Sequence, residues 1–186
     1  VLSVGCSLLF GLLFGILAGY LGGWIDRILT FCSDIIMALP GLLLILLFAA
    51  IAPGTFWALY LGISLVMWVE FFRIVRALTQ TIAGSAEIQS SRLMGMGFWY
   101  CFKRHFFPKL APVVMTLSAF AAGNAVLALA TLGFVNVGLR PPTPELGLMM
   151  TELFPYYYEA PWIFLQPVLV VFLLVLSFQL MSGRVK

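Results

Sequence analysis

The sequence has 186 residues, of which 63% are hydrophobic and 9% are charged, with a mean hydropathy of +1.11 and a formal net charge of +3. A soluble globular domain usually carries about 25% charged residues, so this composition excludes a protein whose whole surface faces water. At about 20 residues for each spanning helix, the chain has room for five or six membrane helices. We therefore predict an all-α integral membrane protein with a single transmembrane domain over residues 1–186.

The first apolar run extends from about Val1 to Leu21 and ends at two consecutive glycines. Further glycines recur inside it at or near four-residue spacing: Gly5, Gly11, Gly15 and Gly19. This spacing either places small residues along one helical face, where a second helix can approach closely, or reflects ordinary glycine usage in a membrane helix. Both interpretations predict a span.

Four more apolar runs follow, at about 28–52, 56–72, 111–135 and 161–181. Pro40-Gly41 interrupts the first of these four and predicts a kink or a break, because proline lacks the N–H that a helix interior requires. The longest polar connection covers about 77–110, and a second one, rich in Pro and Gly, covers about 136–160. We expect five spans in this chain.

The basic residues predict the orientation. Because successive spans alternate sides, nine of the ten basic residues fall on one side: Arg27, Arg73, Arg76, Arg92, Lys103, Arg104, Lys109, Arg184 and Lys186. The positive-inside rule makes this side cytoplasmic, together with the 77–110 connection and the C-terminus, and leaves only Arg140 opposite. Residue 1 then lies outside, so we expect a sixth helix before Val1 if the protein begins in the cytoplasm. An outer aromatic belt is expected from Trp57, Tyr60, Tyr156, Tyr157, Tyr158 and Trp162.

The polar connection before the fourth span contains a short helix signal. Ser85 resembles an N-cap, and Gly95 and Gly97 supply a stop or a turn. The segment is either a merely solvated basic loop or a short exposed helix, which would be marginal alone in water and must dock on something.

Residues Arg92, Gly95, Pro108 and Pro112 resemble in their spacing the "EAA" signature of ABC importer permeases, in which an acidic-Ala-Ala triplet precedes a glycine. Aligned on Gly95, the triplet here is Gln89-Ser90-Ser91, so an amide replaces the acid and two serines replace the alanines. Similarity to the dipeptide/oligopeptide/nickel permease family extends over nearly the whole chain. The landmarks of its outer loop, which follow Leu132-Gly133-Phe134, are Gly138, Pro141, Pro142, Pro144, Glu145 and Gly147.

The resemblance implies a type I ABC importer (MetI-like) fold whose first helix precedes Val1. It implies a coupling helix and loop at about 85–110 and an extracytoplasmic loop at about 136–160. The implied partners are a second homologous permease, two cytoplasmic ATPases that carry ATP and Mg, an extracytoplasmic solute-binding protein and the lipid of a bacterial or archaeal inner membrane, with no nucleic acid. The cargo of this family comprises peptides, nickel or metal chelates, and other small solutes. The implied coupling residues are Glu87, Gln89, Ser90, Ser91, Arg92, Gly95 and Pro108.

Three polar residues lie within predicted spans. We expect Glu70 to form a local or inter-helix ion pair, because Arg73 follows it by three residues, and Asn124 to hydrogen-bond a neighbouring helix. Asp34 is about 10 Å along the helix from Arg27, so it either packs against a neighbouring helix or lies at a subunit contact.

The chain has no Gly-Lys-Ser/Thr nucleotide loop and no nucleophile–base constellation, so we expect a permease subunit and not an enzyme. His105 is the single histidine, and the widely spaced cysteines form no metal-ligand pattern. A secondary transporter or channel would need polar clusters within the membrane or an inverted repeat, and a membrane scaffold subunit is the third possibility. Stoichiometric ATPase partners would distinguish the importer from both.

Overall fold

The fold is taken from a computed structural model that describes residues 2–139 and 142–184, without the side chain of Arg184. The predictions that involve Val1, Arg140, Pro141 and Lys186 lie outside the described residues. The elements in chain order are α1 (Leu2–Leu21), α2 (Gly23–Met37), α3 (Gly41–Ile51), α4 (Phe56–Ala83), α5 (Ala86–Leu93), α6 (Phe98–Cys101), η1 (Phe102–Phe106), α7 (Phe107–Phe134), α8 (Leu146–Leu153), η2 (Phe154–Tyr156) and α9 (Pro161–Arg184). Element η1 is a π-helix and η2 is a 3-10 helix.

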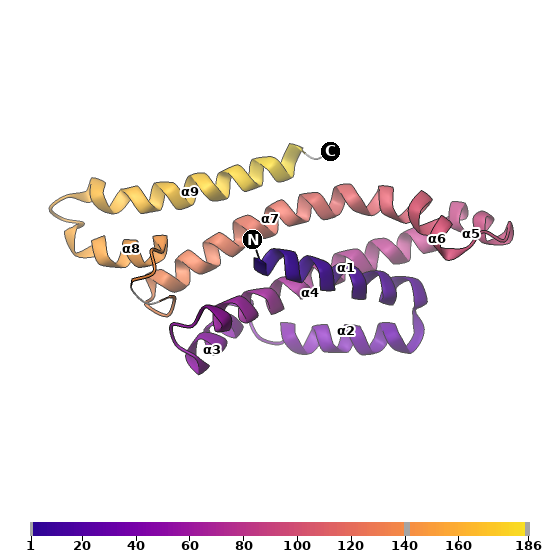
Figure 1. Cartoon of the computed structure of the whole chain (residues 1–186), viewed down its shortest axis with the longest axis horizontal. Helices are drawn as coiled ribbons and strands as arrows, with labels where there is room; N and C mark the ends of the chain where they lie inside the picture. Colours follow the sequence, from indigo (N-terminus) through magenta and orange to yellow (C-terminus); the bar gives the residue numbers. More distant parts are fainter. Residues whose placement is uncertain (1, 140–141, 185–186) are drawn as a thin grey trace.

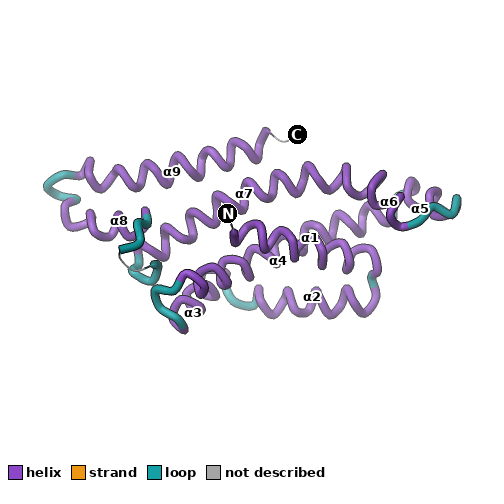
Figure 2. Tube along the Cα trace, viewed as in Figure 1, coloured by secondary structure: helices purple, strands orange, loops and turns teal. Residues whose placement is uncertain are grey.

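Long helices lie roughly along one axis, with the loop after α5 at one end and the loop before α9 at the other (Figures 1 and 2). Within the described residues, 4 helices are long and apolar enough to cross a membrane, or up to 5 when α2 and α3 count as one broken span. The α2–α3 pair is bent by 77°. The predicted break at Pro40-Gly41 is therefore confirmed, and it is a sharp break.

The glycines of α1 allow it to pack closely against α4. A Cβ at Gly15 would lie 2.8 Å from the Cβ of Val75, and one at Gly19 would lie 2.6 Å from the Cβ of Thr79. A Cβ at Gly11 would collide with Phe71, whereas Gly5 has no atom within 4 Å of that position. Close helix approach is thus the correct interpretation for three of the four glycines.

The third span and the connection after it differ from the prediction. Helix α4 continues to Ala83, and a continuous helical run of 37 residues begins at Phe98, so the connection without helix is much shorter than 77–110. Hydropathy missed the end of α4 because polar side chains interrupt it there. These side chains are neutralised by another helix: Arg73 Nη2 donates to Asp34 Oδ1 at 2.6 Å, and Arg76 Nη2 donates to Asp26 Oδ2 at 2.6 Å.

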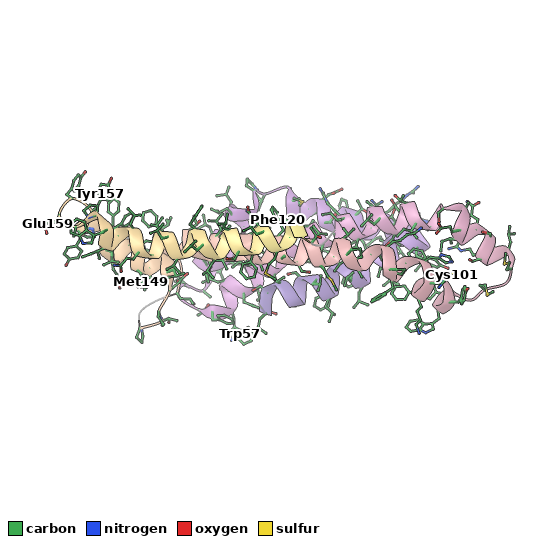
Figure 3. All side chains as sticks on the ribbon, turned by 90° about the horizontal axis from the view of Figure 1, so that it is seen from above. Trp57, Cys101, Phe120, Met149, Tyr157 and Glu159 are labelled. Atoms are coloured by element: carbon green, nitrogen blue, oxygen red, sulfur yellow. The ribbon has the colours of Figure 1, made fainter. Side chains whose placement is uncertain are left out.

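Helices α7, α8 and α9 complete the fold, with α9 packed along α7 and α8 against the C-terminal end of α7. The 136–160 connection is therefore not a simple loop, because it contains α8. Trp57 and Tyr157 lie in the half of the long axis that holds α3 and α8, and Cys101 lies toward the end that holds α5 (Figure 3).

Candidate functional site

The end of the molecule formed by α5 and α6 reverses the chain between two long helices. Helix α5 begins after Ser85 and ends at Leu93, with Met94 as its C-cap, and Gly95 then adopts a left-handed conformation with φ of +76°. This conformation costs other residue types free energy, so the predicted stop at Gly95 is confirmed. The N-terminus at Ser85 is also confirmed, but its hydroxyl donates to Ile82 O at 2.7 Å and so does not cap α5.

One face of α5 is anchored to the helical bundle. Ile88 is completely buried in an apolar cluster whose other buried members are Val75, Ile82, Cys101, Phe106, Leu110 and Val114. An isolated helix of eight residues is unstable in water, so this burial is what holds α5 in place. The interpretation of the segment as a merely solvated loop is wrong for this face.

Polar contacts tie α5 to the start of α7. Lys109 Nζ donates to Glu87 Oε2 at 2.6 Å, and His105 Nδ1 lies 3.7 Å from the same oxygen. The hydrogen bond and the positive charge of Lys109 lower the pKa of Glu87 below its ordinary value. The other ring nitrogen of His105 contacts Ser91 Oγ at 3.1 Å. His105 therefore connects Glu87 and Ser91, both predicted from the resemblance, and Lys109 holds Glu87 alone; the sequence did not indicate either role.

Arg92 is held by an aromatic contact with α1. Its guanidinium carbon lies 4.8 Å from the centre of the Tyr20 ring, and Tyr20 in turn makes edge contacts with Phe98 and Phe106. A cation over an aromatic face is attracted by the ring quadrupole. No motif spacing pairs Arg92 with a residue 72 positions away (92 − 20), so only the fold reveals this contact.

The signature triplet faces outward. Gln89 and Ser90 are exposed, and Ser91 is half-buried. Gln89 Nε2 donates to Gly84 O at 3.4 Å, and Ser90 Oγ donates to Ala86 O at 2.6 Å. The polar side chains therefore bind the backbone of their own segment, and Pro108 is exposed in the first turn of α7.

Large apolar side chains cover the tip of this end. Leu93 is 89% exposed, Met94 is 74% exposed and Trp99 is 72% exposed; Met96, Phe98 and Tyr100 are exposed beside them. Apolar side chains gathered at the surface mark interaction sites. Residues 89–100 are called the coupling tip below, after the coupling helix that the resemblance implies for this segment.

The outer-loop motif surrounds a buried carboxyl group. Glu145 is 8% exposed, and its Oε2 accepts a hydrogen bond from Leu139 N at 3.2 Å. Its Oε1 has no hydrogen-bond partner in the described part of the chain. A Cβ at Gly133 would lie 3.0 Å from Oε1, and one at Gly138 would lie 2.9 Å from Oε2 and 2.8 Å from the Cα of Gly133, so glycine lets the backbone pass close to the carboxyl group. Burial raises the pKa of Glu145, although the Leu139 N–H opposes this shift.

The other motif residues of this loop occupy different settings. Gly147 is buried against Ala130, whose backbone a Cβ at Gly147 would strike. Pro142 and Pro144 are exposed. The structure thus brings Gly138, Glu145 and Gly147 together, and it leaves the two prolines at the surface.

The polar residues within the spans differ from the prediction in two cases. Asp34 pairs with Arg73 at 2.6 Å, so it packs against a neighbouring helix. Glu70 makes no ion pair with any described residue, because Asp34 occupies Arg73. Asn124 makes no hydrogen bond to the described residues, and it lines with Glu70 a small cavity of about 160 Å³ beside the α2–α3 break. The expected ion pair of Glu70 and hydrogen bond of Asn124 are therefore not formed among the described residues.

These features define a multi-helix membrane protein with a broken span and an anchored helical tip. The model of the family described as "Binding-protein-dependent transport system inner membrane component" matches residues 11–185, and the chain belongs to this family. The predicted family and the type I importer fold are thereby confirmed.

Curated relatives are permease proteins. The chain is 32% identical over 186 residues to a glutathione transport system permease protein of Pectobacterium atrosepticum, covering 100% of this chain and 62% of the relative. It is 35% identical over 163 residues to a dipeptide transport system permease protein of Haemophilus influenzae, covering 87% of this chain and 55% of the relative. A glutathione transport system permease protein of Shigella dysenteriae is 31% identical over 163 residues, covering 88% of this chain and 54% of the relative. The chain spans less than two thirds of the length of these relatives.

Proposed function

We propose that the chain is a permease subunit of an ATP-driven importer and forms half of the translocation pathway for a peptide or a related small solute. Family membership supports the transport role, and the names of the relatives, which refer to glutathione and dipeptides, favour peptide cargo. Nickel and metal chelates are the weaker alternative, because these names do not include them. A second permease, two ATPases with ATP and Mg, and a solute-binding protein complete the proposed assembly.

The observation that carries the proposal is the construction of the coupling tip. Helix α5 is fixed to the bundle by Ile88 on one side and presents exposed Leu93 and Met94 at its end. A rigidly held apolar surface can transmit a push or pull, whereas a free loop cannot. We assign this tip to the cytoplasmic side, docked on an ATPase, so that closure of the ATPases moves α4 and α7 and opens the pathway outward.

The orientation follows from the same assignment. The basic residues Lys103, Arg104 and Lys109 lie with the coupling tip, as the positive-inside rule requires for a cytoplasmic end. The loop that contains Glu145 would then be extracytoplasmic, available to the binding protein. Glu70 and Asn124, which lack partners in the described residues, would face the pathway or the second permease.

Substitution of Gly95 tests the docking assignment. Gly95→Val places a β-branched residue at φ of +76°, which distorts the tip, whereas Gly97→Val changes a residue with φ of −67° that has open space around it. We expect Gly95→Val to abolish transport and the ATPase activity stimulated by the binding protein, and Gly97→Val to retain most of both. Unchanged transport in Gly95→Val would contradict the assignment, and permease that purifies without ATPase subunits in mild detergent would contradict the importer itself.

A further inference from the structure

An apolar groove runs between α1 and the segment from α6 to α7. It encloses about 650 Å³, within the range typical of small-molecule sites. Its lining is apolar throughout. Leu9, Leu13 and Leu17 line it on α1, and Trp99, Phe102 and Phe107 line it on the opposite segment.

The face of α1 that lines this groove carries large apolar side chains in place of the small residues that favour close approach of another helix. Helices in membranes associate through small or polar residues, and α1 uses its glycines against α4 on the opposite side. The groove face instead presents half-exposed Leu9, Leu13 and Leu17. The eight residue steps from Leu9 to Leu17 rise about 12 Å, close to half of the roughly 30 Å hydrocarbon core. This face therefore fits the acyl chain of one leaflet.

Two cations follow Phe102, which lines the groove, in the part of the chain that returns from the coupling tip. Lys103 and Arg104 are exposed and form no ion pair or hydrogen bond with the described residues, in contrast to Lys109, which is bound to Glu87. Lys103 is four residues from Trp99 and four from Phe107, both of which line the groove, so it shares their side of the helix. Trp99 is 72% exposed, and its amphipathic ring is typical of the membrane–water interface.

We propose that the groove and these two cations bind one anionic phospholipid of the cytoplasmic leaflet. Its acyl chain lies between α1 and α7, and its phosphate is bound by Lys103 and Arg104. Charge complementarity favours this occupant, because unpaired Lys and Arg beside an apolar groove between helices recognise anionic headgroups. The assignment to the cytoplasmic leaflet rests on the orientation in the proposed function.

The test is lipid binding to the complete purified transporter. Phosphatidylglycerol and phosphatidylcholine are added in mixed micelles, and bound lipid is counted by native mass spectrometry. We expect preferential binding of phosphatidylglycerol, and a loss of about twenty-fivefold in its affinity in the variant Lys103→Gln/Arg104→Gln, at about fivefold for each cation. Leu13→Trp fills the groove while retaining both cations, and we expect it to expel the lipid.

Arg27→Gln is the matched control, because Arg27 is an exposed cation that stacks on Trp24 at 5.7 Å and does not line the groove. Equal binding of both lipids, or the same loss of phosphatidylglycerol in the control variant, would overturn the proposal. It would also be overturned if a cysteine at position 13 crosslinked efficiently to another permease subunit, because protein would then occupy the groove. The ATPase content of the same samples is measured separately: missing ATPase subunits contradict the proposed function, whereas missing lipid selectivity contradicts only this site.

Discussion

Removal of the Ile88 side chain should release α5 from the bundle. Ile88→Ala deletes three carbon atoms from a site that is completely buried. At about 0.8 kcal/mol for each carbon, the lost transfer free energy is about 2.4 kcal/mol, and the cavity left behind adds to this cost. Since α5 has only eight residues, it has little stability of its own to offset the loss. A change of this size increases the undocked population roughly fiftyfold.

Hydrogen exchange of the purified transporter measures this release directly. We expect the amides of residues 86–93 to exchange roughly fiftyfold faster in Ile88→Ala, while those of α1 and α4 keep their protection. Stimulation of the ATPase by the loaded binding protein should fall in parallel. Leu93→Ala is the control in permease separated from the ATPase subunits, because Leu93 is on the same helix but 89% exposed, and its exchange should match that of the wild type prepared in the same way. Unchanged exchange in Ile88→Ala would refute the reasoning that burial of this side chain holds α5 in place.

Three further predictions concern the α1–α4 contact, the outer loop and the α5 ion pair. Gly15→Leu should force α1 and α4 apart, because even a Cβ at this position would lie 2.8 Å from the Cβ of Val75. The purified Gly15→Leu permease should therefore melt at a lower temperature than the wild type. Gly5→Leu is the control and should melt as the wild type does, because the space around Gly5 is open. Burial raises the pKa of Glu145 in the folded state above its ordinary value of 4.5, so the charged form destabilises the protein. The wild type should therefore lose stability as pH rises from the ordinary value through the higher folded value. Glu145→Gln should lack this pH dependence, and identical pH profiles of the two proteins would contradict the prediction. Lys109 lowers the pKa of Glu87, so the stabilising contribution of this pair is present above the ordinary pKa of 4.5 and is lost as pH falls through the lower pKa of the folded state. Glu87→Gln should remove this pH dependence from the hydrogen exchange of α5. If the dependence persists in the variant, it belongs to another group and the prediction is wrong.

The helices that cross the membrane could be predicted from local composition. The first run predicted α1 almost to the residue, because an apolar stretch of this length has few alternatives once backbone groups must be satisfied internally. Proline at position 40 predicted the break before α3 for an equally local reason, the missing N–H. Gly95 predicted the end of α5, because few other residues adopt its backbone conformation.

The end of α4 was not predictable in the same way. Arg73, Arg76 and Gln80 lower the hydropathy of its last turns, and hydropathy alone cannot distinguish a loop from a helix whose charges are neutralised elsewhere. The acids that neutralise them, Asp26 and Asp34, lie at least 39 positions away in the chain. The ion pair expected for Glu70 does not form among the described residues for the same reason, since Arg73 already has a partner on α2.

The sequence by itself therefore determined the class of this protein, its apolar spans, the α2–α3 break and the existence of a short helix between two long ones. These properties depend on residues close together in the chain, through burial of apolar surface and the dihedral limits of Pro and Gly. Only the tertiary structure decided that Ile88 anchors the coupling tip, that Tyr20 holds Arg92, and that Glu145 is buried in the outer loop. Each of these depends on which distant segment lies alongside, because charge neutralisation and burial are properties of neighbours in space.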